Sequence, residues 1–168
     1  LSLLEDSGTF ISRVADDRIG YFTTIFQDYT NTLQETQYVR YINKWNLRKK
    51  DNSNNKDNVS LPTVPGNLNT VLVEPQEPIV YWIENTVPEE FRAAIKEGVL
   101  AWNQAFERIG YKNAIVAKQM PDDASWNPGD VRYNTIRWII QPGSGYAVGP
   151  SRANPFTGEI YDADIRIS

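Results

Sequence analysis

The sequence predicts an α/β fold, of the mixed α+β kind: a twisted, mixed sheet of about five strands with one long helix on one face, preceded by a β-hairpin region. Two observations lead to this prediction. Residues 79–117 read as strand, helix and strand, and three further strand-like segments follow before residue 168. A strand–helix–strand unit has a right-handed crossover and parallel strands, so the helix should cover one face of the sheet.

The first strand and the helix carry the clearest signals. Residues 79–83 are β-branched and aromatic, which is typical of a buried strand. Residues 86–109 should form the helix, with Thr86 and Glu89 as a capping box, Pro88 in the first turn and Gly110 as the stop. Six apolar residues recur at spacings of three and four and should form a single core-facing stripe: Phe91, Ile95, Val99, Trp102, Phe106 and Ile109.

The remaining strands are predicted at residues 114–117, 135–140, 146–149 and 159–167, with a turn at residues 155–158. The fourth of these segments alternates along its length, so Asp162 and Asp164 should face the same side. They would form either a carboxylate pair or, as we expect, inward polar contacts of a final strand.

Ahead of this unit, residues 17–24 and 38–45 read as two strands of a partly covered hairpin, with turn chemistry between them. From residue 48 the composition becomes polar and then rich in proline. We therefore expect a β-rich region at residues 1–50, a linker or long loop at 51–77, and the sheet domain at 78–168.

Composition excludes several classes of function. The 17 basic and 21 acidic residues give a net charge of −4, which does not favour a nucleic-acid partner. The chain has no cysteine and no histidine. This excludes disulfides, thiolate metal sites, Ser-His-Asp and Cys-His catalysis, and histidine zinc sites. No apolar stretch reaches the length of a membrane span.

Both ends of the sequence suggest a longer polypeptide. The start lacks an initiator Met and a basic leader, and the final strand-like residues end with no tail. We expect the chain to be a piece of something larger.

Several strings, in this order, resemble large bacterial zinc-dependent proteases in which a region of unknown function precedes a metzincin-like catalytic domain. The strings are DRIGYF at 17–22, RYINKW at 40–45, IKEGV at 95–99 with AWN at 101–103, KNAI at 112–115, IRW at 136–138 and TGEI at 157–160. The resemblance covers nearly the whole chain except residues 48–77. It implies the upper half of a metzincin domain, with spatial strand order second, first, third, fifth, fourth.

In that family the zinc ligands lie in an HExxHxxGxxH helix downstream of the upper sheet. This sequence ends before such a helix, so no catalytic residue and no metal ligand is assigned to it, and zinc is expected only in the complete protein. The resemblance does imply a substrate-binding edge strand for a peptide or protein substrate, formed by Tyr146, Ala147, Val148, Gly149, Pro150 and Ser151. It also implies export to the periplasm or outside the cell. Pro150 has no N–H, so strand pairing should stop or change partner there.

Two alternatives stay open. Asp122, Asp123 and Asp130 lie in a turn-rich segment and would either hold calcium or, as we expect, be solvated loop carboxylates, since they lack EF-hand spacing. The chain would also suit a self-standing peptide- or glycan-binding module without enzymatic activity.

Overall fold

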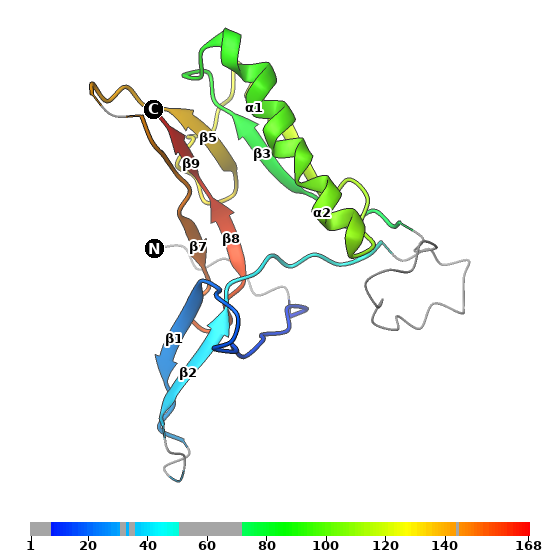
Figure 1. Cartoon of the computed structure of the whole chain (residues 1–168), viewed down its shortest axis with the longest axis vertical. Coiled ribbons are helices and arrows are strands. Elements are labelled where there is room, and N and C mark those ends of the chain that lie inside the picture. The colour runs from blue at the N-terminus through cyan, green and yellow to red at the C-terminus, as the bar shows by residue number, and fades with distance from the viewer. Residues whose placement is uncertain (1–7, 31–32, 34–35, 51–71, 144) are drawn as a thin grey trace. The chain divides into compact units, whose positions relative to one another are not determined.

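The computed structural model describes residues 8–30, 33, 36–50, 72–143 and 145–168 (Figure 1). The chain divides into two compact units. One comprises Leu1–Asn46 with Ser151–Ala163, and the other Leu47–Pro150 with Asp164–Ser168. Residues 151–163, which the sequence analysis placed with the sheet domain, therefore group with the first unit. Most of the predicted linker, residues 51–71, lies outside the described residues.

The second unit contains the predicted five-stranded mixed sheet. Its strands are β3 (Ile79–Ile83), β4 (Ile115–Gln119), β5 (Asn134–Trp138), β6 (Ala147–Val148) and β9 (Ile165–Ile167). The order in space is β4-β3-β5-β9-β6, with β6 antiparallel to β9 and the other pairs parallel. In order of appearance along the chain this is second, first, third, fifth, fourth, so the predicted strand order is confirmed.

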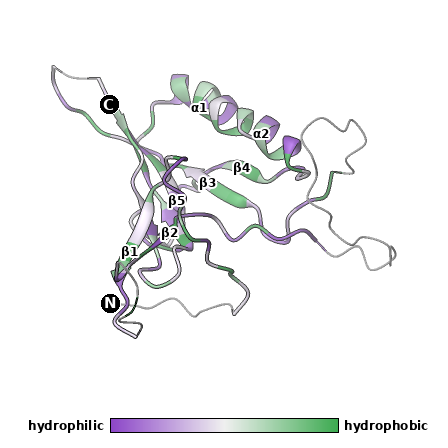
Figure 2. Ribbon diagram, turned by 60° about the horizontal axis from the view of Figure 1, so that its bottom comes forward, coloured by the Kyte–Doolittle hydropathy of each residue, from purple (hydrophilic) through white to green (hydrophobic). Residues whose placement is uncertain are grey.

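One face of this sheet is covered by a helical segment, α1 (Glu89–Ala101) followed by α2 (Asn103–Arg108) (Figure 2). Trp102 separates the two but keeps helical dihedral angles, φ −63° and ψ −21°. The Phe91 ring stacks on Trp138 of β5, with 5.2 Å between ring centroids. The core of the unit consists of Ile79, Ile83, Val87, Val99, Ala114, Ile115, Ala117 and Ile136.

The predicted apolar stripe is only partly correct. Val99 is buried and Ile95 and Phe106 are half-buried, but Trp102 is 65% exposed. Asn103 faces the sheet instead, because its side-chain amide donates to the Ile115 carbonyl and its side-chain oxygen accepts from the Ile115 N–H. Phe91 and Ile109 at the two ends of the stripe are also exposed.

The predicted capping box is wrong. The helix begins at Glu89 after Pro88, with no side-chain cap, and Glu89 and Glu90 stabilise its first turn through their charge. The Thr86 hydroxyl instead donates to Glu84. At the other end Gly110, with φ +86°, ends the helix as predicted.

The first unit contains two antiparallel pairs: β1 (Thr23–Gln27) with β2 (Tyr38–Ile42), and β7 (Ser151–Ala153) with β8 (Ile160–Ala163). The hairpin is confirmed, but its first strand starts later than the predicted residue 17. The reason is a turn in which Asp16 accepts hydrogen bonds from the N–H groups of Arg18 and Ile19. Lys44 joins the two pairs, because its N–H donates to Gly158 and its carbonyl accepts from Ile160.

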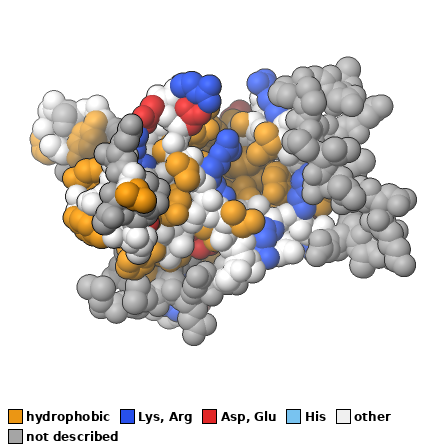
Figure 3. All heavy atoms as spheres, turned by 90° about the horizontal axis from the view of Figure 1, so that it is seen from below, with side chains coloured by type: hydrophobic (Ala, Val, Ile, Leu, Met, Phe, Trp, Pro, Cys, Tyr) orange, Lys and Arg blue, Asp and Glu red, His pale blue; other side chains and the backbone are white. Residues whose placement is uncertain are grey.

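Large hydrophobic side chains remain on the surface of this first unit, among them Ile11, Val14, Phe22, Ile25 and Phe156. Figure 3 shows one face of the molecule, where hydrophobic and basic side chains are interspersed. None of the helices in the described ranges is long and apolar enough to cross a membrane.

Candidate edge-strand site

Strand β6 forms one edge of the five-stranded sheet and pairs only with β9 in the described part of the chain. Its register places Ala147 opposite Ile167 and Val148 opposite Arg166. Residues 145–150 are all exposed, with Tyr146 at 41% and Val148 at 45%. A sheet edge of this kind presents backbone donors and acceptors to which another extended chain can pair.

The register also shows which backbone groups face outward. The Ser168 N–H donates to the Tyr146 carbonyl, and the Asp164 N–H donates to the Pro150 carbonyl. In an antiparallel ladder the hydrogen-bonding residues alternate along the strand. The backbone groups of Val148 therefore point toward β9, and those of Ala147 and Gly149 point away from it.

The predicted site residues do not all belong to this edge. Tyr146, Ala147, Val148, Gly149 and Pro150 lie in the second unit, whereas Ser151 begins β7 in the first unit and pairs with Ala163. Strand β6 ends at Val148, two residues before Pro150. An end close to Pro150 is expected, because proline has no N–H to donate to a neighbouring strand.

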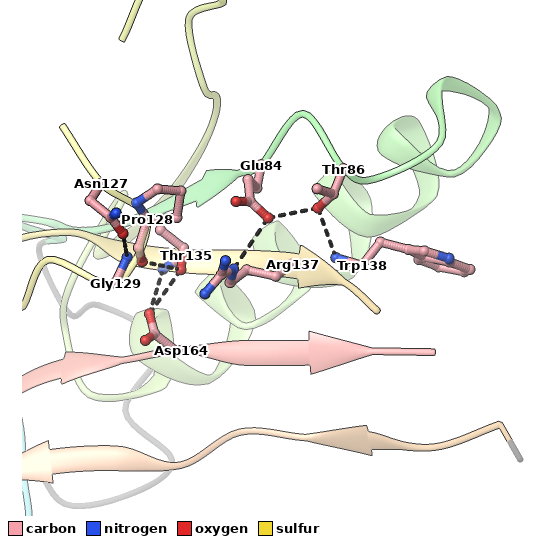
Figure 4. A network of polar contacts seen from close by, with 9 residues as sticks. All are labelled: Glu84, Thr86, Asn127, Pro128, Gly129, Thr135, Arg137, Trp138 and Asp164. Carbon is pink, nitrogen blue, oxygen red and sulfur yellow. Dashed lines mark hydrogen bonds and ion pairs between the residues drawn. The ribbon is translucent and has the colours of Figure 1, made fainter. Parts of the chain in front are cut away.

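In the interior of the same sheet, a network of polar contacts joins the end of β3 to β5 (Figure 4). The buried Glu84 carboxylate accepts from the Thr86 hydroxyl at 2.6 Å and from Arg137 Nε at 3.2 Å. The Thr86 oxygen in turn accepts from the Trp138 N–H at 3.2 Å. These contacts fix the loop that follows β3 on the carboxyl end of the sheet, the end where open α/β sheets bind ligands.

A second buried contact in the same view joins β5 to the start of β9. Asp164, 4% exposed, accepts from the hydroxyl and the N–H of the fully buried Thr135, at 2.8 and 3.3 Å. Asp162, in the first unit, instead forms an ion pair with Arg152. Both carboxylates are buried and make polar contacts, as expected, but the predicted single strand at 159–167 is wrong: it is divided at Asp164 into β8 and β9, which belong to different units.

The three loop carboxylates do not gather into a metal site. Asp130 is bonded to Arg132, which lowers the Asp130 pKa to about 2 through the side-chain hydrogen bond and the backbone N–H of Arg132. Across the described ranges, no group of three or more acidic residues is placed to hold a metal ion.

Two arginines close to the edge were not predicted as site residues from the sequence. Arg137 of β5 is directly opposite Arg166 of β9, which is opposite Val148 of β6. Residues in register on adjacent strands share a face, so all three side chains lie on the face away from the helix. The alternation in residues 163–167 could have indicated that Arg166 shares a face with Asp164, but the residues opposite Arg166 on the neighbouring strands depend on register, which could not be predicted from the sequence.

Comparison with known proteins found a family model over the N-terminal part of the chain. A family model described as a domain of unknown function (DUF5117) matches residues 6–50. No curated protein and no solved structure matches the chain.

Proposed function

We propose that this chain is the non-catalytic front part of a zinc-dependent peptidase of the metzincin type, and that it supplies the upper wall and the substrate-binding edge of the cleft. The observation that carries the proposal is the strand order β4-β3-β5-β9-β6, with the single antiparallel strand at the exposed edge. The strings quoted above, in their shared order, add support.

The edge would act by straightening the substrate. An extended peptide would exchange backbone hydrogen bonds with the outward groups of Ala147 and Gly149, whatever its side chains. Holding the peptide in a fixed, extended geometry lowers the entropic part of the barrier to attack on one of its bonds. The buried contacts of Glu84, Thr135 and Asp164 would keep the sheet behind the edge rigid.

The residues of this chain do not fit a zinc site, because it contains neither histidine nor cysteine. The metal and the general base would come from residues outside it, and no step of the proposal above depends on them.

The test uses the longest natural polypeptide that contains this chain. We expect it to retain zinc, to hydrolyse unstructured peptides and to lose that activity with a chelator. In it, Ala147→Pro removes an outward donor and should lower kcat/KM by a factor corresponding to about 1–3 kcal/mol. Ala147→Gly keeps the donor and serves as the matched control.

Two results would contradict the proposal. A zinc-containing, active polypeptide in which Ala147→Pro cleaves like the parent would remove the edge from the mechanism. A natural polypeptide that ends near Ser168 and binds peptides or glycans without cleaving them would favour the self-standing binding module.

A further inference from the structure

We infer that the sheet edge prefers extended peptides with glutamate on one face, and that Arg166 determines this preference. The inference rests on the proposed function, because it requires a peptide strand beside β6. It adds a substrate class: acidic side chains at every second position, facing away from the helix.

The position of Arg166 follows from the register. A peptide residue directly opposite Val148 would have its side chain on the same face as Val148 and Arg166. Because neighbouring strands are about 4.8 Å apart, its Cα would be about 10 Å from that of Arg166. An extended arginine and a glutamate side chain together span this distance. Aspartate is one methylene shorter, so its carboxylate would reach less far toward Arg166.

Val148 lies between the two partners and leaves the path open. Its side chain is short, so the aliphatic part of Arg166 can lie over it while the guanidinium stays in water. Both residues are exposed in the structure.

The surrounding charges leave Arg166 available. Among the described residues, no side-chain hydrogen bond or ion pair involves Arg166, whereas its neighbour Arg137 is paired with the buried Glu84. Asp164 lies on the same face two residues earlier, but it is buried and accepts from Thr135. Two arginines directly opposite each other repel, so an incoming carboxylate would also relieve part of that repulsion.

The experiment is a titration of the ¹⁵N-labelled 168-residue chain with three capped nonapeptides, followed by two-dimensional NMR at about 0.15 M salt, where distant charges are screened. The peptides are threonine throughout, except that the third, fifth and seventh residues are all glutamate, all glutamine or all lysine. The amide of Ala147, which faces outward, reports binding at the edge.

We expect the glutamate peptide to bind about two- to five-fold more tightly than the glutamine peptide, and the lysine peptide more weakly, as for an exposed ion pair. Arg166→Gln should abolish the difference, and Arg166→Glu should reverse it. Lys118→Glu is the matched control: Lys118 lies on the same face but on β4, at the opposite edge of the sheet, and the preference should persist.

The outcomes separate this inference from the proposed function. If all three peptides shift Ala147 but Arg166→Glu leaves their ranking unchanged, the glutamate preference is wrong and the edge site stands. If none of the three peptides shifts the Ala147 amide signal, both the edge site and the preference fail.

Discussion

At the scale of single residues, Gly158 shows how little space a turn can leave. It closes the β7–β8 connection with φ +79°, and its N–H donates to the Asn154 carbonyl. A Cβ at this position would lie 2.6 Å from the Ile42 carbonyl oxygen, a backbone atom of the same unit. Both the dihedral angle and the contact therefore require glycine.

We predict that Gly158→Ala lowers the free energy of unfolding by about 1–3 kcal/mol. The backbone dihedral angle would be strained for alanine, and the added Cβ would push against the Ile42 carbonyl oxygen. Gly20→Ala is the control: nothing lies within 4 Å of the Cβ it would add. Its stability should be unchanged or slightly higher. Urea denaturation of both variants measures the difference, and equal midpoints would show that the turn at Gly158 can relax.

The Asp130 carboxylate gives a pH prediction. Arg132 holds its pKa at about 2, below the ordinary 3.8. A lowered pKa means that the folded state binds this proton less readily than the unfolded state, so the stabilising contribution is present above about pH 4 and is lost as the pH falls through about 2. NMR titration of the side-chain carboxyl carbon should show this low pKa in the parent. In Arg132→Gln it should rise toward 3.8, and a pKa that stays near 2 would mean that another group is responsible.

At the scale of elements, the helix shows why a polar residue can take a core-facing position. Ile95, Val99, Asn103 and Phe106 are spaced by four, four and three, so they follow one side of the helix as well as any apolar set would. Asn103 is tolerated on this side because both the nitrogen and the oxygen of its side-chain amide form hydrogen bonds with the backbone of β4. Trp102, one residue earlier, is consequently turned about 100° away from that side.

The alternation along β6 predicts that two proline substitutions in neighbouring residues differ in their effect on folding. Val148→Pro removes a donor that points toward β9 and should lower the free energy of unfolding by about 1–3 kcal/mol. Ala147→Pro removes an outward donor and should cost less than about 1 kcal/mol. Thermal or urea unfolding of the isolated chain tests this without any substrate. If Ala147→Pro were the more damaging variant, the register of β6 on β9 would be shifted by one residue.

At the scale of the whole molecule, the two compact units are interleaved along the sequence. Each one is completed by a segment from the C-terminal end: Ser151–Ala163 for the first and Asp164–Ser168 for the second. The matched family model covers residues 6–50, which corresponds to most of the N-terminal part of the first unit. The first unit therefore includes residues far outside that match.

The composition of the whole chain gives a prediction about metal. Without histidine and cysteine, only carboxylates and backbone or side-chain oxygens remain as ligands, and these seldom form a closed zinc site. Metal analysis of the purified chain after dialysis should find far less than one zinc per molecule. One tightly held zinc per chain would overturn this reading, and it would require a carboxylate cluster involving residues outside the described ranges.

The sequence by itself determined most of the elements and their order along the chain, but it did not predict β7 and it joined β8 and β9 into one strand. The β-branched run at 79–83, the spacing of the apolar residues of the helix and the glycine at 110 are local signals, and they set the type of each element because backbone preferences act over a few residues. Strand order came from the resemblance.

Only the tertiary structure decided which side chains meet. The pairing of Glu84 with Arg137, of Asp164 with Thr135 and of Arg166 with Val148 depends on register between strands that are distant along the chain, and a shift of one residue would have changed every one of these partners.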